Sequence, residues 1–336
     1  MSSRKVREPG GGAHTASIGF KLTFLGLLLL AYLPKLQTQT VAVTVDDLPY
    51  APGSSNPPGP DDSKTAELIN KRLLYAFSQA HIPVTGFVVE QVAEQIGMGT
   101  GRRILKRWTR PGFDLGNHTH SHADFDTFSV DDFEREIERG ESTIGPLLQS
   151  VSRKPQYFRF PHNHTGGTKE KHDAIAAFLV ARGYRLAPCT IDTSDYEFDP
   201  AYVLALKRHD KETAAKLRAD YLSYTAAEID WYSKLDEQVF GYEVPHVMLL
   251  HDNQLNADTI SDIIALFKQR GYRFVTLTEA LQDPAYATPE TYITKFGPMW
   301  GYRWAKELSV KVNGSGEPDP PAWVDQYVKE AHSRTN

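Results

Sequence analysis

The order of apolar and amphipathic segments restricts the fold more than any other feature of this sequence. Short apolar runs alternate with segments of helical periodicity from Val41 to Leu277. We expect strands at residues 41–46, 84–89, 114–117, 157–160, 185–191, 246–250 and 273–277. Such alternation predicts a parallel α/β sheet. About seven strands over this length fit one (β/α)7 barrel better than two domains.

Two segments go beyond what a simple barrel needs. Residues 200–244, between the fifth and sixth strands, carry helically spaced apolar residues and are expected to form an inserted helical pair. This pair is either an outer layer or a wall over the substrate cleft. Residues 283–336 form an aromatic-rich C-terminal extension, in which Trp300, Tyr302 and Trp304 either pack against the barrel or offer a stacking platform. The barrel domain itself is expected at residues 39–282.

The first 38 residues have the pattern of a targeting segment. Basic residues precede an apolar run from Leu22 to Leu33, which has the length of a signal-peptide core and is shorter than the roughly 20 residues of a spanning helix. We therefore expect residues 1–38 to be a signal peptide or an N-terminal membrane anchor, with a buried helix as the alternative. Export follows from the first interpretation, with membrane association if the segment is an anchor.

Composition limits the chemistry that this chain can perform. Its 336 residues carry a net charge of −5, so no basic field favours nucleic acid. A single cysteine, Cys189, excludes an intrachain disulfide and a thiolate metal cluster. Any metal must therefore be held by carboxylates and by some of the twelve histidines. No protein partner is inferred.

Acidic residues and histidines lie at the ends of the expected strands, where parallel α/β folds place their active sites. One division of roles makes Asp47 a metal ligand and Asp46 a general base, and a solvated turn is the alternative. His118 and His122 share one face if their segment forms a helical turn. With Asp47 they suit zinc or another divalent ion, and exposed histidines without a ligand are the alternative.

Other strand ends add an arginine, an aspartate and a histidine. Arg159 is placed to pair with Asp46 and to hold it ionised, although a surface ion pair is the alternative. Asp192 ends the fifth strand and His251 the sixth. A histidine bonded to a buried carboxylate has a raised pKa and can act as a general acid. A lone His251 is more often structural.

Five segments in this order resemble the motifs of the polysaccharide deacetylases, the NodB-homology family also called carbohydrate esterase family 4. They are TVDD at 44–47, HTHSH at 118–122, RFPHN at 159–163, DTSDY at 192–196 and LLH at 249–251. The resemblance extends from about Val41 to Leu281. It implies a distorted (β/α)7 barrel of the NodB-homology type.

The resemblance implies a metal site with an adjacent base. A divalent metal, usually zinc, is held by Asp47, His118 and His122. Asp46 is the base that activates water, and Arg159 orients Asp46.

It also implies a proton donor and a substrate pocket. His251 protonates the departing amine, supported by an acid of the fourth motif, for which we expect Asp192. The backbone N–H of His162 helps to hold the oxyanion. Tyr196 and Leu249 are expected beside the substrate.

Several positions depart from the family pattern. Asn163 stands in place of the third-motif glycine, His162 replaces a tyrosine, Tyr196 replaces a tryptophan, and Leu48 replaces the glycine after the acids. These changes affect the substrate pocket and leave the metal and proton-transfer groups intact.

The expected activity is therefore a metal-dependent hydrolysis of N-acetyl groups on the amino sugars of a glycan. Peptidoglycan, a chitin-like oligomer and an exopolysaccharide are the substrate classes considered. Two alternatives stay open: hydrolysis of a non-sugar amide or an O-acetyl ester at the same site, and a non-catalytic glycan-binding relative.

Overall fold

The computed structural model describes residues 39–53 and 57–333. The targeting segment predicted at residues 1–38 lies outside this part of the chain. Within the described residues, no helix combines the length and apolar character needed to span a bilayer.

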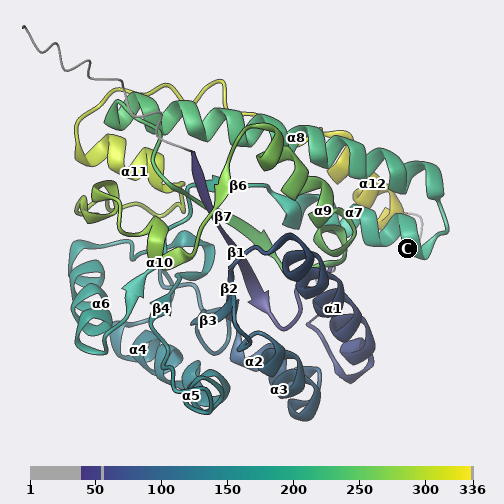
Figure 1. The fold of residues 1–336 in the computed structure, drawn as a ribbon, viewed down its shortest axis with the longest axis horizontal. Helices are drawn as coiled ribbons and strands as arrows, with labels where there is room; N and C mark the ends of the chain where they lie inside the picture. The colour runs from purple at the N-terminus through teal and green to yellow at the C-terminus, as the bar shows by residue number, and fades with distance from the viewer. Residues whose placement is uncertain (1–38, 54–56, 334–336) are drawn as a thin grey trace, which may run out of the picture. The chain divides into compact units, whose positions relative to one another are not determined.

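The strands form one parallel sheet with seven strands in the order β5-β4-β3-β2-β1-β7-β6, and β8 pairs with the start of β1 (Figure 1). The strands are β1 (Thr40–Leu48), β2 (Val84–Val88), β3 (Phe113–Asn117), β4 (Tyr157–Phe158), β5 (Arg185–Leu186), β6 (Ile191–Asp192), β7 (His246–His251) and β8 (Arg273–Phe274). This curled parallel sheet confirms the distorted barrel expected from the sequence.

The predicted fifth strand, at 185–191, is two short strands. β5 pairs with β4, whereas β6 pairs with β7 at the other end of the strand order. The amide of Ala187 still donates to β4 and that of Thr190 to β7, on either side of Pro188, which has no N–H to donate. The chain thus crosses from one edge of the sheet to the other, and this crossing distorts the barrel.

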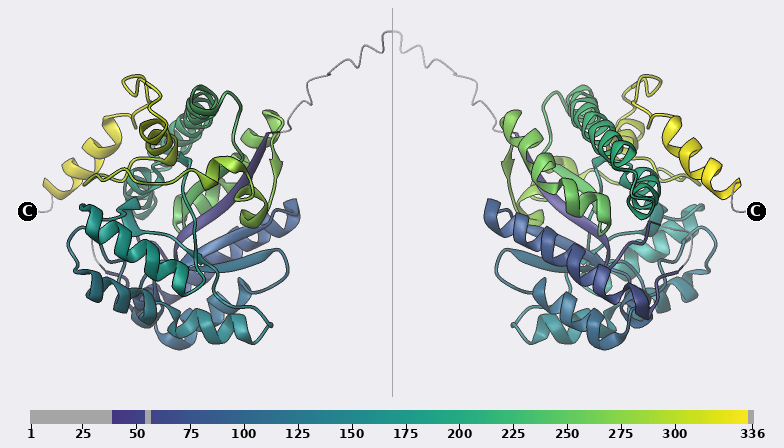
Figure 2. Two further views of the ribbon diagram at one scale, coloured as in Figure 1. Left: turned by 90° about the vertical axis from the view of Figure 1, so that its left-hand side faces the viewer. Right: turned by 90° about the vertical axis from the view of Figure 1, so that its right-hand side faces the viewer.

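Helices surround the strands (Figures 1 and 2). They are η1 (Pro60–Asp62), α1 (Ser63–Ala80), α2 (Glu90–Gln95), α3 (Met98–Arg107), α4 (Val130–Arg139), α5 (Glu141–Gln149), η2 (Pro161–Asn163), α6 (Lys169–Ala181), α7 (Asp195–Lys207), α8 (Lys211–Phe240), α9 (Gln254–Gln269), α10 (Leu277–Ala280), η3 (Pro284–Ala287), α11 (Trp300–Glu307) and α12 (Trp323–Ser333). The expected helical pair is α7 and α8, and it begins at Asp195 rather than at residue 200.

The alternation of side chains along β1 explains why an acid is buried at its end. Val43 and Val45 face the cluster between the sheet and the outer helices. Ala42 belongs to a separate interior cluster, and Thr44 and Asp46 follow it on the same face because successive residues of a strand point to opposite sides. Asp46 therefore reaches the interior of the barrel.

The C-terminal extension packs against the helical pair. Helix α11 contacts α8, and α12 contacts α7. Trp300 and Trp304 are buried, so packing against the barrel domain is the correct alternative for these two residues. Tyr302 is half-buried, and its hydroxyl accepts from Trp231 and donates to Glu317.

Candidate active site

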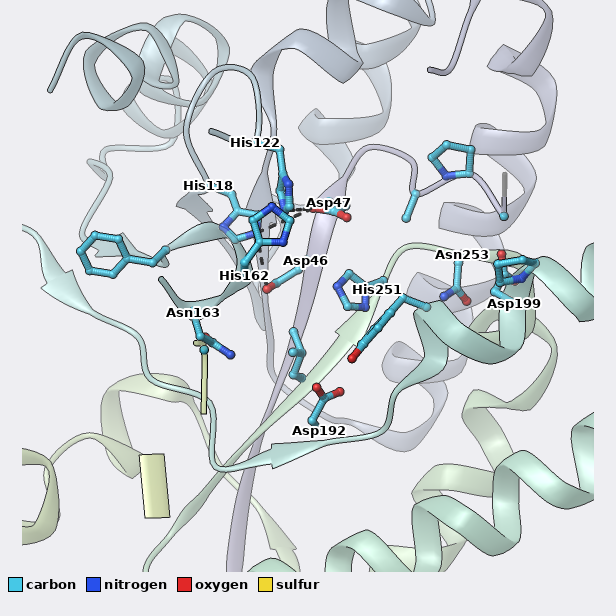
Figure 3. Close-up of a pocket in the computed structure, with 18 of the residues that line it drawn as sticks. Asp46, Asp47, His118, His122, His162, Asn163, Asp192, Asp199, His251 and Asn253 are labelled. Atoms are coloured by element: carbon cyan, nitrogen blue, oxygen red, sulfur yellow. Dashed lines mark ion pairs between the residues drawn. The ribbon is translucent and has the colours of Figure 1, made fainter. Parts of the chain in front are cut away.

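A cavity of about 480 Å³ lies at the carboxyl ends of the strands (Figure 3). Every predicted site residue except Arg159 lines it, and Arg159 is buried behind Asp46. The walls of the cavity are formed by Asp46, Asp47, Ala51, Pro52, Gly53, His118, His122, Phe160, His162, Asn163, Asp192, Tyr196, Asp199, Pro200, Leu249, His251, Asn253, Gly297 and Met299.

Asp47, His118 and His122, which we call the metal triad, converge at one side of this cavity. Oδ1 of Asp47 lies 3.4 Å from Nε2 of His122 and 3.7 Å from Nε2 of His118. One donor atom from each residue fits within 4.8 Å of the other two. Oδ1 of Asp47 is buried and has no hydrogen-bond partner among the described residues. An unpartnered carboxylate oxygen facing two imidazole nitrogens fits a divalent metal.

The surroundings of His118 leave one of its ring nitrogens available as a ligand. Its Nδ1 contacts the backbone oxygen of Arg159 at 2.9 Å, which leaves Nε2 as the free acceptor. Burial lowers the pKa of His118 to about 4, so the ring is neutral at pH 7. The segment is an irregular loop rather than the helical turn considered from the sequence, with Thr119 and His122 at positive φ. The loop nevertheless places the rings of His118 and His122 5.0 Å apart.

Asp46 is held by a buried arginine, so the pair is not at the surface. Nη1 of Arg159 donates to Oδ1 of Asp46 at 2.7 Å and to Oγ1 of Thr44 at 2.7 Å. The guanidinium lies 4.3 Å from the centre of the Phe87 ring, and its Nε donates to the oxygen of Ala187. These contacts fix the position of Asp46, whose Oδ2 faces His118 at 3.7 Å.

His251 pairs with Asp195, which corrects the expectation that Asp192 supports it. Nδ1 of His251 lies 2.6 Å from Oδ1 of Asp195, and the amide of His251 donates to Oδ2 of the same carboxylate. Asp192 accepts from the amide of Ser194 and lines the cavity. Burial by itself lowers the pKa of His251. The charge and hydrogen bond of Asp195, together with the charges of Asp47 and Asp46, outweigh this effect and raise the pKa to about 10.

The third motif forms a turn in a rarely adopted backbone conformation. His162 has φ 57° and Asn163 has φ 55°. Glycine and asparagine tolerate this left-handed region best, which explains why Asn163 can replace the family glycine. The exposed His162 ring lies 4.5 Å from that of His122, next to the metal triad.

Sequence reasoning missed several residues at or beside the cavity. Asp195 is buried behind His251 and lies inside a recognised motif, and the expectation chose the other acid of that motif. Asp199 comes one helical turn later, and burial raises its pKa to about 7. Asn253 stands two residues after the fifth motif, so its position in the sequence could have indicated that it lines the cavity. No local pattern indicated Gly297 and Met299, because they reach the cavity from the C-terminal extension.

Comparison with known families agrees with this geometry. A family model described as "Polysaccharide deacetylase" matches residues 34–179. The matched part of the chain is similar to the polysaccharide deacetylases. Three of the five recognised motifs, those at 44–47, 118–122 and 159–163, lie within it.

Relatives of this family are distant from the present chain. A chitin deacetylase of Arthroderma benhamiae is 27% identical over 94 residues, which are 28% of this chain and only 23% of that relative. A peptidoglycan-N-acetylglucosamine deacetylase of Bacillus cereus is 23% identical over 248 residues, or 72% of this chain and 68% of the relative.

One solved structure supports the same fold. The chitin deacetylase of the fungal pathogen Colletotrichum lindemuthianum is 22% identical, with a TM-score of 0.50 over 73% of this chain and 89% of that chain. A pseudoenzyme of carbohydrate esterase family 4 from Bacillus anthracis is 16% identical, and the match covers 73% of this chain and 66% of the pseudoenzyme chain with a TM-score of 0.47.

Proposed function

We propose that this chain is a metal-dependent deacetylase that removes N-acetyl groups from amino sugars in a glycan. The observation that carries the proposal is one cavity in which a metal triad, a carboxylate fixed by arginine and a histidine fixed by a carboxylate all meet. A bound divalent metal, for which we propose zinc, would supply Lewis-acid polarisation and acidify water. The other groups then divide the proton transfers between them.

Asp46 is the proposed base. Its Oδ1 is held by Arg159, so its Oδ2 is directed toward the metal triad and is free to take a proton from the attacking water. The amide N–H of His162, at the strained turn, is the proposed donor to the oxyanion.

His251 is the proposed acid. Asp195 keeps its ring protonated, and the ring lies at the cavity wall, so it can donate a proton to the departing amine. The ring of Tyr196 packs edge-on at 5.7 Å and limits the orientations of the imidazole.

The names of the relatives suggest chitin-like oligomers and peptidoglycan as substrates. A polymer of the cell surface also agrees with the proposed export of the chain, which rests on the apolar run at residues 22–33.

Acetate release is the test of this function. Chelated protein reloaded with zinc should release acetate from N-acetylglucosamine oligomers or peptidoglycan, and the chelated protein should not. Bound zinc with acetate released only from O-acetyl esters or non-sugar amides would reassign the substrate. Absence of both zinc and turnover would leave a glycan-binding relative.

Asp195→Asn should move the basic limb of the pH–kcat profile to lower pH. His251 must be protonated to act as an acid, so activity is lost as pH rises through its pKa. In the parent protein Asp195 holds that pKa at about 10. Without the carboxylate charge the pKa falls, and kcat at pH 8 should drop at least about tenfold.

Asp192→Asn is the matched comparison, because it removes an acid of the same motif that lines the cavity without bonding His251. Its basic limb should shift less than that of Asp195→Asn. A larger shift in Asp192→Asn than in Asp195→Asn would show that Asp192, and not Asp195, raises the pKa of His251.

A further inference from the structure

The third-motif turn, residues 161–165, needs support from outside its own segment. Two consecutive non-glycine residues, His162 and Asn163, adopt positive φ, and such conformations persist only where the surroundings hold them. The turn places the ring of His162 4.5 Å from that of His122, and its amide is the proposed oxyanion donor. Its stability therefore bears directly on the proposed chemistry.

Arg303 of helix α11 provides that support. Its guanidinium is almost fully buried, with 1% of the side chain exposed. Nη2 donates to the backbone oxygen of Asn163 at 2.7 Å, and Nη1 donates to Oγ1 of Thr165 at 3.0 Å. Both acceptors belong to the turn, more than 130 residues earlier in the chain.

The same guanidinium fixes the cavity wall formed by the extension. Its Nε donates to the oxygen of Pro298 at 3.2 Å, and Nη1 bonds Oε1 of Glu290 at 2.7 Å. The other oxygen of Glu290 lies 2.6 Å from Nε2 of His172 on α6. Arg303 is thus the point at which the extension, the turn and α6 are joined, with its charge balanced by Glu290.

The extension also touches the turn directly. A Cβ at Gly297 would lie 1.8 Å from the backbone oxygen of His162, so only glycine allows this close approach. Gly297 and Met299 line the cavity, whereas Pro298 between them is held by Arg303.

We propose that Arg303 is a positioning residue for deacetylation, which holds the His162–Asn163 turn in its reactive geometry. The inference rests on the proposed function and adds to it. It makes the C-terminal extension a part of the active site, although the family match ends at residue 179. The forked, planar guanidinium is essential, because an ammonium cannot reach the turn, Pro298 and Glu290 together.

Arg303→Lys and Arg303→Gln test this proposal in the full-length protein. We expect kcat for acetate release to fall about 10- to 100-fold, as small displacements of reacting groups do. Zinc content should be unchanged, because the metal triad does not contact Arg303. The NMR signal of the His162 ring, measured in histidine-labelled protein, is assigned by its loss in His162→Gln. This signal should shift in the Arg303 variants, because movement of the turn changes the position of the ring relative to the His122 ring, now 4.5 Å away.

Tyr302→Phe is the matched control. It removes two hydrogen bonds of the neighbouring residue in the same extension, to Trp231 and Glu317, without touching the turn. Its kcat should stay within about twofold of the parent value, and its His162 signal should not move. An equal loss of kcat in Tyr302→Phe would show that general loosening of the extension is responsible and would overturn the proposal.

Thr165→Val provides a milder variant should the Arg303 variants fail to fold. It removes one acceptor of the guanidinium and should lower kcat about threefold to tenfold with the same NMR shift. Parent-level kcat and an unmoved His162 signal in foldable variants would refute the positioning role. If the parent protein releases no acetate from any substrate, the proposed function fails, and the His162 signal alone decides whether Arg303 positions the turn.

Discussion

Asp46→Asn should lower kcat for acetate release by about 10³-fold and leave zinc content unchanged. An amide of the same shape can still accept the hydrogen bond from Arg159, so the local structure is expected to persist. It cannot take a proton from water, and general base catalysis contributes roughly 10²- to 10⁴-fold. Acetate assays and metal analysis on the same preparation measure both quantities.

Asp230→Asn is the control for this substitution. Asp230 pairs with Arg270, and more than half of its side chain is exposed, so the variant loses the same charge far from the cavity. Its kcat should stay within about twofold of the parent value. An Asp46→Asn protein that kept more than a tenth of the activity would exclude Asp46 as the base.

His122→Ala should weaken zinc binding on the order of 10³-fold and abolish acetate release at limiting zinc. Removal of one of three protein ligands leaves only Asp47 and His118 to hold the ion. The side chain of His122 is 28% exposed, so its loss is expected to be tolerated by the fold. Titration with zinc, and the rise in Tm that zinc produces, measure the affinity.

His120→Gln is the matched control, because it changes a histidine of the same motif that points elsewhere. Nε2 of His120 contacts Arg139 at 2.8 Å and Glu94 at 3.4 Å, away from the triad. This variant should bind zinc as the parent does. Zinc loss in His120→Gln together with parent-like binding in His122→Ala would refute the ligand assignment.

The sequence predicted the parts of the site that are encoded locally. Strands followed directly by acids or histidines indicated Asp46, Asp47, His118 and His251, since the carboxyl ends of parallel strands meet at one edge of a sheet. Alternation of strands and helices predicted the parallel sheet, and the observed strand order brings these residues into one cavity.

Other features depended on contacts between distant segments. The choice of Asp195 rather than Asp192 as the partner of His251 is set by the start of α7, which places one carboxylate against both the ring and the amide of His251. The division of the predicted fifth strand leaves β5 paired with β4 and β6 paired with β7, with Pro188 between them. The choice between Asp192 and Asp195 has no local sequence signal, because both acids stand in the same motif.

The sequence by itself therefore predicted the fold class and a resemblance to the deacetylase family, and it indicated the residues that we propose as metal ligands and proton-transfer groups. These features are encoded in the alternation of short segments and in motifs of neighbouring residues. Only the tertiary structure decided which carboxylate serves His251 and how the strained turn at His162 is held. It also placed Arg303 and Gly297, from a segment outside the family match, against that turn. Hydrogen bonds and close packing between residues more than 50 positions apart exist only after the chain has folded, and no pattern of neighbouring residues encodes them.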